Sequence, residues 1–377
     1  MWGGGKSRQR DSNIELFRII TMLLIVAHHY VVNSGLTLES GPIYADPLSE
    51  QSVFLLLFGA WGKIGINCFV LITGYFLCKS QITAKKFVKL LFEVMFYRIM
   101  ICVIFWVAGY TPITIESAVE TFVPITAIAQ NFTGTYLVFF LCIPFLNILI
   151  RNLSEKQHVY LLILSCFIYV FFGTVKVLPV IMNYVSWYMV LYFIASYIRL
   201  YPKKIFSSRK VWRWMTVIAV LLSALSVIAC TWIGLKIDRD MAFFFVTDSN
   251  TFLAVLTGVS AFLFFKNIKL RYNKVINAIA STTFGVLLIH ANSDAMRQWL
   301  WKDILDNVGV YDSAWLPIHA IGSVVLIFAA CSVIDLFRIR FIERPCLAWW
   351  DKHEEQIVGK YKKIERRICE KLHISAE

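Results

Sequence analysis

The feature that most constrains this chain is a series of apolar stretches, each about as long as a bilayer is thick. A membrane-spanning helix needs roughly 20 consecutive apolar residues, and about ten separated stretches of that length occur here. They cover approximately residues 14–33, 52–78, 88–109, 122–150, 159–178, 184–200, 211–234, 250–266, 275–291 and 316–337. Transmembrane strands alternate apolar and polar residues, whereas these stretches are apolar on every face. The sequence therefore predicts an all-α integral membrane protein, a bundle of about ten transmembrane helices.

The composition agrees with a chain that is surrounded mostly by lipid. Hydrophobic residues make up 58% of the 377 residues and charged residues only 16%. Soluble globular chains contain about half apolar and about a quarter charged residues. The second and fourth stretches are longer than one span needs, so we expect a break in each, at Gly59, Gly62 or Gly65 and at Pro124 or Gly134.

The charged residues alternate from loop to loop. The basic loops hold Lys79, Lys85, Lys86, Lys89, Arg199, Lys203, Lys204, Arg209, Lys210, Arg213, Lys266, Lys269, Arg271 and Lys274, and the acidic loops hold Glu39, Asp46, Glu50, Glu116 and Glu120. Because cytoplasmic loops carry an excess of Lys and Arg, this pattern places both termini in the cytoplasm and requires an even number of spans. The net charge of +13 thus follows from membrane topology and indicates no nucleic-acid partner.

The domain organisation is simple. We expect one transmembrane domain, residues 1–350, followed by a charged cytoplasmic tail, residues 351–377. The nine cysteines form no CxxC or Cys/His pattern, so the sequence predicts no metal site. The first apolar stretch follows Lys6 and Arg8 as a signal peptide would, but it contains ionisable residues and lacks a cleavage site of small residues. We therefore interpret it as a retained first helix.

Ionisable side chains in this first helix indicate where the chemistry lies. Such groups inside a span cost about 2.5–3.5 kcal/mol each on insertion scales, so they are functional candidates by default. Arg18 and His29 are eleven residues apart, so at 100° per residue they return to within about 20° of each other, and about 16 Å separates them along the helix axis. Glu15 lies one turn before Arg18, close enough to pair with it, while His28 points about 100° away. The alternative is structural: an ion pair that anchors the helix at the interface and histidines that bond to neighbouring helices.

This stripe suits a donor that has a phosphorylated head and an acyl group. A guanidinium presents a planar fork to phosphate, and an imidazole takes up a hydroxyl proton near neutral pH. With Arg18 near the cytoplasmic interface and His29 past the midplane, the head group and the acyl group of one ligand would meet the two residues in turn.

Several motifs resemble those of the acyltransferase-3 family of bacterial membrane acyltransferases, many of which O-acetylate surface polysaccharides. NIELFRIITMLLIVAHHY, residues 13–30, is similar to the family's first helix, and INCFVLITGYFL, residues 66–77, is similar to its second-helix signature. Looser matches are VPITAIAQNFTGTYLVFFLCIPFLN, VSWYMVLYFIASYIR, STTFGVLLIHAN and FIERP, with Asn131 at a position where the family usually has Trp. The resemblance runs from residue 13 to about 350. It implies ten helices in the bacterial inner membrane, an acyl-CoA donor that is usually acetyl-CoA, no bound cofactor, and a carbohydrate acceptor on the outer side.

The resemblance and the helix geometry together give each candidate residue an expected role. His29 is expected to act as general base on the acceptor hydroxyl, or to relay the acyl group, while Arg18 and Glu15 hold the donor. Lys86 and Lys89 are expected either to bind the phosphates of acyl-CoA or to serve membrane topology alone. The candidates for the acceptor side of the pocket, each with a structural alternative, are Asn67, His290 and Trp187.

Two other classes of function remain open from the sequence. A polytopic transporter or flippase for a polysaccharide precursor also places charged groups in its spans. A non-catalytic partner of a polysaccharide synthase would tolerate the loss of His29. Covalent change of the glycan distinguishes the acyltransferase from both.

Overall fold

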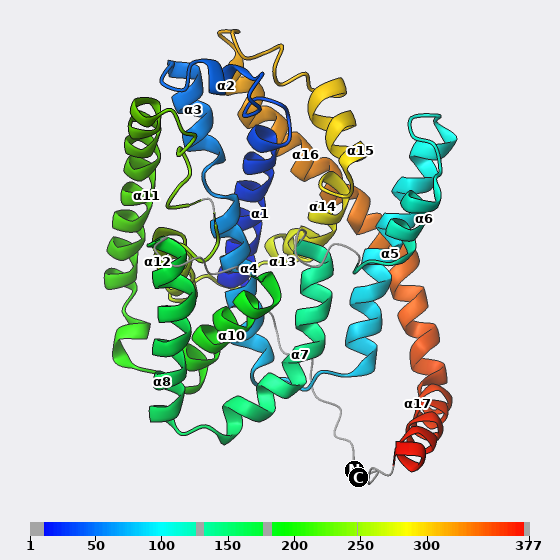
Figure 1. Ribbon diagram of the computed structural model, residues 1–377. Coiled ribbons are helices and arrows are strands. Elements are labelled where there is room, and N and C mark those ends of the chain that lie inside the picture. Colours follow the sequence, from blue (N-terminus) through cyan, green and yellow to red (C-terminus); the bar gives the residue numbers. More distant parts are fainter. Residues whose placement is uncertain (1–10, 126–131, 176–182, 247, 373–377) are drawn as a thin grey trace. The chain divides into compact units, whose positions relative to one another are not determined.

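The computed structural model describes residues 11–125, 132–175, 183–246 and 248–372 (Figure 1). These residues form helices and loops and contain no strand, which confirms the predicted all-α class. The chain divides into two compact units, Met1–Ser332 and Val333–Glu377, and each is described by itself. The predicted boundary after residue 350 stays a prediction, and Asn131 lies outside the described residues.

The helices follow one another with short connections. In the first unit they are α1 (Ser12–Val32), α2 (Pro42–Ala45), α3 (Glu50–Gly59), α4 (Gly62–Leu77), α5 (Ala84–Val107), α6 (Ile115–Phe122), α7 (Phe132–Asn152), α8 (Glu155–Cys166), η1 (Phe167–Phe171), α9 (Phe172–Thr174), α10 (Tyr184–Leu200), η2 (Lys204–Ser207), α11 (Arg209–Ile237), α12 (Phe252–Lys266), α13 (Lys274–Ala280), α14 (Thr283–His290), α15 (Asp294–Arg297), η3 (Gln298–Ile304) and the greater part of α16 (Leu316–Arg338). The second unit holds the end of α16, η4 (Ile339–Glu343) and α17 (Arg344–Leu372).

Where the structure describes them, the ten predicted apolar stretches are mostly helical. Among the described residues, seven helical segments are long and apolar enough to cross a membrane, or up to eight if the bent pair Lys274–His290 and Asp294–Ile304 is one span. The stretches that fall short are α10 with 17 residues, α12 with 15, and the interrupted α13 and α14. At 1.5 Å per residue α12 is only about 22 Å long, shorter than the roughly 30 Å hydrocarbon core. The count of ten spans and the orientation of the termini therefore stay predictions.

Helix α1 is the central helix of the first unit. It packs against α3, α4, α12, α13 and α14 (Figure 1). Near its start, the Asn13 side-chain amide donates to the carbonyl of Phe265 at the end of α12 (3.0 Å). Near its end, the Tyr30 hydroxyl hydrogen-bonds to His319 Nδ1 of α16 (2.8 Å). Both ends of α1 are thus held, which gives the stripe of Arg18 and His29 a defined direction.

The predicted break in the second stretch is confirmed, because α3 ends at Gly59 and α4 begins at Gly62. The glycines there also let α3 and α4 approach α1 closely. A Cβ at Gly59 would meet Val31 at 2.9 Å, and one at Gly62 would overlap the ring of His28. Only glycine leaves the room that this helix crossing needs. In the fourth stretch α6 ends at Phe122 and Pro124 lies in a turn, whereas Gly134 lies within α7.

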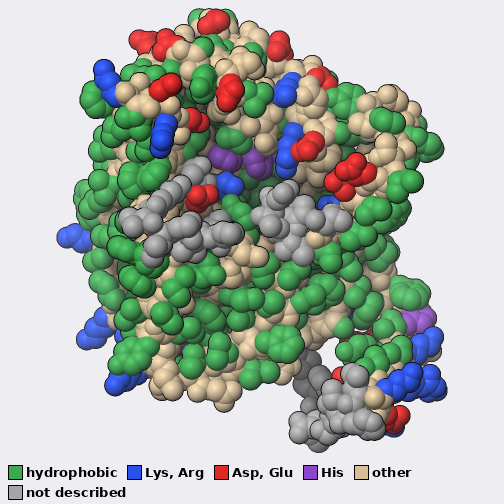
Figure 2. Space-filling view, viewed as in Figure 1, with side chains coloured by type: hydrophobic (Ala, Val, Ile, Leu, Met, Phe, Trp, Pro, Cys, Tyr) green, Lys and Arg blue, Asp and Glu red, His purple; other side chains and the backbone are tan. Residues whose placement is uncertain are grey.

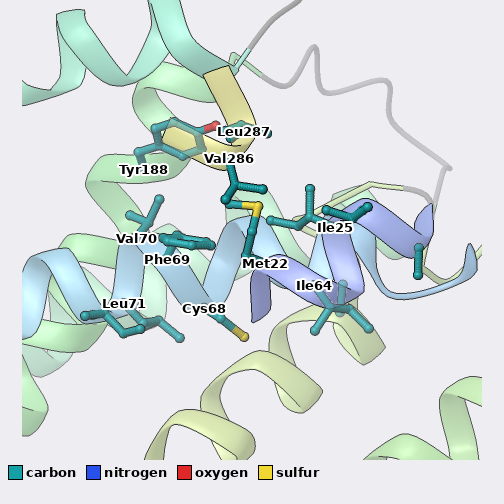
Figure 3. Packing of buried hydrophobic residues seen from close by; sticks show 14 of the residues in the cluster. Met22, Ile25, Ile64, Cys68, Phe69, Val70, Leu71, Tyr188, Val286 and Leu287 are labelled. Carbon is teal, nitrogen blue, oxygen red and sulfur yellow. The ribbon is translucent and has the colours of Figure 1, made fainter. Parts of the chain in front are cut away.

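The apolar core lies between α1, α4, α10 and α14. Figure 3 shows Met22 and Ile25 of α1 beside Phe69 of α4 and Val286 of α14. All four are buried or line the cavity described below. On the surface of the molecule, Figure 2 shows acidic side chains gathered at one end of the face drawn.

In the second unit, the FIERP motif supplies an ion pair. Arg338 of α16 donates to Asp335 through Nε and to Glu343 of η4 through Nη1, each at 2.7 Å. Glu343 is the acidic residue of the motif. The motif therefore joins α16 to the following helical turn.

Candidate active site

A cavity of about 260 Å³ lies beside α1, and both Arg18 and His29 line it. The predicted stripe on the first helix therefore does project into one enclosed space. Figure 2 shows histidine side chains together with basic and acidic ones in a hollow of the face drawn. The full lining is Arg18, Met22, Ile25, His28, His29, Gly62, Lys63, Ile66, Phe69, Thr73, Leu90, Glu93, Phe132, Tyr136, Thr283, Phe284 and Leu287.

Glu15 reaches this cavity only through Arg18. Its Oε2 lies 3.6 Å from Arg18 Nε, and its side chain is 7% exposed while that of Arg18 is 28% exposed. Glu15 is absent from the lining. Its position suits a residue that orients the Arg18 guanidinium.

His29 forms a hydrogen-bonded pair with His290. Its Nδ1 lies 2.9 Å from Nε2 of His290, and Nδ1 of His290 lies 2.6 Å from the carbonyl oxygen of Val286. A carbonyl only accepts, so Nδ1 of His290 carries the proton and its Nε2 is an acceptor when the ring is neutral. His29 Nδ1 must then donate, which leaves the lone pair of a neutral His29 on Nε2. The pair thus selects the tautomer that a general base requires.

His290 does not itself line the cavity. It was predicted to line the acceptor path, but it is fully buried, and its contact with the site is the bond to His29. The structure therefore gives it a positioning geometry. The reason is that α14 packs against α1, which brings two residues 261 positions apart in the chain into contact.

His28 also lines the cavity, although its position about 100° away from the stripe of Arg18 and His29 did not predict this. Its Nδ1 lies 2.6 Å from the carbonyl oxygen of Gly59, so Nδ1 donates and the Nε2 lone pair remains. The missing side chain at Gly62 leaves space for the ring. The site therefore holds two imidazoles with the same tautomer.

Two charged residues of the lining were not predicted from the sequence: Lys63 on α4 and Glu93 on α5. The Lys63 ammonium donates to the Tyr184 hydroxyl (3.0 Å) and lies over its ring. Both residues fall inside predicted apolar stretches. Ionisable residues inside a span are functional candidates by default, so the sequence indicates Lys63 and Glu93 in the same way as Arg18.

The Thr73–Gly74–Tyr75 signature of the second helix has three separate contacts. Thr73 lines the cavity and shares a hydrogen bond with the Tyr136 hydroxyl (3.0 Å). A Cβ at Gly74 would meet a side chain of α10 at 2.9 Å, so glycine allows α4 and α10 to pack closely. Arg199 donates to the Tyr75 hydroxyl (2.8 Å) and stacks over its ring. The signature thus couples the cavity wall to the packing of α10.

Asn67 and Trp187 lie away from the cavity. Trp187 Nε1 donates to Asn67 Oδ1 (3.0 Å), and Asn67 Nδ2 donates to the carbonyl of Ser249 (2.6 Å). Both side chains are fully buried, and neither belongs to the lining. Asn67 thus makes a hydrogen bond between α4 and α10, and an acceptor-binding role for Asn67 and Trp187 stays a prediction.

Lys86 and Lys89 are exposed near the start of α5 and do not line the cavity. Lys86 Nζ donates to Ser80 Oγ (2.7 Å) and to the carbonyl of Gln81 (2.6 Å). Leu90, the next residue after Lys89, is the first residue of α5 in the lining. The lysines therefore lie at the margin of the cavity, and binding of phosphate by them stays a prediction.

The described residues contain no group of three or more His, Cys, Asp or Glu that could hold a metal ion. A family model for an acyltransferase domain, that of the acyltransferase-3 family, matches residues 11–335. Neither a curated protein nor a solved structure matches the chain. The match covers both helix signatures and the whole lining of the cavity, and the several long apolar helices make this a multi-pass membrane protein. The chain therefore belongs to the acyltransferase-3 family.

Proposed function

We propose that this acyltransferase transfers an acetyl group from acetyl-CoA to a hydroxyl of a cell-surface carbohydrate, at the inner membrane of a bacterium. The observation that carries the proposal is that Arg18 and His29 line one cavity while the His29–His290 pair leaves a lone pair on His29 Nε2. The resemblance described above supplies the donor and the acceptor class.

In this proposal His29 is the general base. Its Nε2 takes the proton of the acceptor hydroxyl as the hydroxyl oxygen attacks the carbonyl carbon of the thioester. A C–O bond forms and the C–S bond breaks, so the thiolate of coenzyme A leaves and recovers the proton from His29. Lys63, on the same cavity, supplies positive charge for the oxygen that becomes negative during the attack.

Arg18 is the anchor for the donor in this scheme. It lies eleven positions before His29 in α1, which corresponds to about 16 Å along the axis. A guanidinium held by Glu15 at one end of the cavity binds a phosphate of the donor while the acyl group extends to the other end. In this scheme the spacing of Arg18 and His29 along α1 matches the distance between the phosphate and the acyl group of the donor.

The experiment that tests the function uses purified protein, radiolabelled acetyl-CoA, and glycans extracted from cells that lack the gene. We expect label to pass to the glycan and the glycan mass to rise by one acetyl increment, with release of free coenzyme A. A transporter or flippase, or a partner of a synthase, would leave the mass unchanged. Unchanged glycan mass with active, donor-bound protein would rule out the proposal.

A second expectation concerns the two lysines. Replacing Lys86 and Lys89 together by glutamine removes two charges that we propose to bind the CoA phosphates, each charged hydrogen bond being worth about 1.5–3 kcal/mol. We expect KM for acetyl-CoA to rise by roughly tenfold or more, while kcat stays within about twofold. Acetyl-pantetheine, which has no phosphates, should show the same KM with both proteins. The matched control is the double change Lys204→Gln and Lys210→Gln, in another basic loop. An unchanged KM for acetyl-CoA would leave topology as the role of Lys86 and Lys89.

A further inference from the structure

A second cavity, of about 420 Å³, lies beside the histidine pair and has no role in the chemistry described so far. It is formed by the end of α5, the segment around α6, the start of α7 and residues 291–297. The side chains that matter for its chemistry are those of Arg98, Cys102, Thr133, Asn292, Asp294 and Arg297. We call it the polar cavity, because its lining carries hydroxyl, amide, carboxylate and guanidinium groups.

The polar cavity adjoins the candidate active site through consecutive residues. Ala291 of its lining directly follows His290, and Thr133 directly follows Phe132, which lines the first cavity. The Arg297 guanidinium also lies within electrostatic range of both His29 and His290. Consecutive residues therefore line the two cavities, and Arg297 of the polar cavity lies near the histidine pair.

Contacts across the polar cavity hold its walls together. The Tyr110 hydroxyl, in the loop after α5, donates to Asp303 of η3. This hydrogen bond raises the pKa of Tyr110 to about 12. The rings of Phe105 and Trp299 also pack at 5.8 Å between centroids. These contacts join the end of α5 and the following loop to η3, next to the residues 291–297 of the lining.

The charged side chains of the lining balance, because Arg98 and Arg297 are matched by Glu120 and Asp294. Arg297 Nη1 lies 2.7 Å from Asp294 Oδ1, and Arg98 donates to backbone carbonyls of Glu120 and Thr121. Alternating donors and acceptors without a net charge suit an uncharged ligand that carries several hydroxyls, since each hydroxyl both donates and accepts.

Arg297 also presents a donor that the protein leaves unused. Its Nε is buried and has no hydrogen-bond partner among the described residues. A buried donor without a partner costs about 1–3 kcal/mol. Among the described lining residues, Arg297 is thus the one with a buried donor that no hydrogen bond uses.

We propose that the polar cavity binds the acceptor as a neutral, polyhydroxylated sugar, and that Arg297 orients it by donating to a ring or hydroxyl oxygen. Asp294 accepts from a neighbouring hydroxyl of the same sugar. The identification of this sugar as the acceptor rests on the proposed function. The binding of a sugar in this cavity is tested without any turnover.

The chain provides its own probe, because Cys102 lines the polar cavity and is a free thiol. A charged methanethiosulfonate reagent should label it in the full-length protein, followed by peptide-resolved mass spectrometry. Cys346 of α17 is exposed, belongs to no lining of this cavity, and serves as an internal control in every sample. The ligands are neutral methyl glycosides of several common sugars, with methyl glucuronide as a charged comparison and trimethylamine N-oxide as an osmolyte control.

We expect at least one neutral glycoside to slow labelling of Cys102 but not of Cys346. The factor is 1 + [L]/Kd, about tenfold when the ligand is present at roughly ten times Kd. Arg297→Gln should abolish the protection and Arg297→Lys should weaken it. Arg239→Gln, the same change at an arginine outside this cavity, should preserve it. Asn292→Ala replaces Arg297→Gln if the latter does not fold.

Three outcomes would overturn the inference: no labelling of Cys102, no protection by any neutral glycoside, or protection by the charged glycoside alone. Protection that persists unchanged in both Arg297→Gln and Asn292→Ala would do so as well. Protection without acetyl transfer would leave the sugar site standing and refute the proposed function instead, so the two failures are distinguishable.

Discussion

Replacing His29 by alanine is expected to lower the rate of acetyl transfer by about 10²–10⁴, the range that general base catalysis supplies. The loss should fall on kcat while KM for acetyl-CoA changes little, because Arg18 and the rest of the cavity remain. The measurement is initial velocity with purified protein over a range of donor concentrations.

The neighbouring histidine makes the test more specific. His290→Ala removes the acceptor of the His29 Nδ1 proton, so the other tautomer of His29 is no longer excluded. We expect a smaller loss than for His29→Ala, with part of it restored in His290→Asn, whose amide oxygen also accepts. His353→Ala, on α17 of the second unit, is the matched control and should behave as wild type. Full activity of His29→Ala would exclude His29 as the general base. Acetyl label found on His29 of the wild-type protein would identify it as an acyl relay instead.

Replacing Gly62 by alanine is expected to destabilise the protein. The added Cβ would overlap the Cγ and Cδ2 atoms of His28, which are the rigid ring and not the end of a flexible side chain. The ring would have to move and lose its bond to the Gly59 carbonyl. Overpacking of this kind typically costs about 1–3 kcal/mol, and a lost hydrogen bond about 1 kcal/mol more.

The measurement is the midpoint of thermal unfolding in detergent, with activity measured in parallel. Gly322→Ala is the matched control, because a Cβ on that glycine of α16 meets nothing within 4 Å. Alanine is the better helix former, so Gly322→Ala should raise the midpoint slightly or leave it unchanged. Equal midpoints for the two variants would mean that α1 and α4 are not packed as described.

Much of the fold followed from the sequence because two physical constraints act locally. The bilayer sets the length of a spanning helix, so the described parts of the ten predicted stretches are mostly helical. The helical period sets which residues share a face, so Arg18 and His29 line one cavity as expected. Glu15 pairs with Arg18 for the same reason, since one turn separates them.

The number of spans did not follow, because length and apolarity decide it only for uninterrupted helices. Helix α12 is short and α13–α14 is bent by 95° against the segment that follows. Whether such helices cross the bilayer depends on how their neighbours cover the exposed backbone groups, and no local pattern encodes those neighbours.

By itself the sequence determined the membrane environment, the family motifs and the side of the first helix that carries the chemistry. Only the tertiary structure decided that His290 fixes the tautomer of His29, that Lys63 and Glu93 share the cavity, and that Asn67 and Trp187 bind each other elsewhere. The physical reason is range. Helical periodicity relates residues within one helix, whereas these contacts join α1, α4, α5, α10 and α14, whose relative rotation is set by close packing at positions such as Gly62 and Gly74.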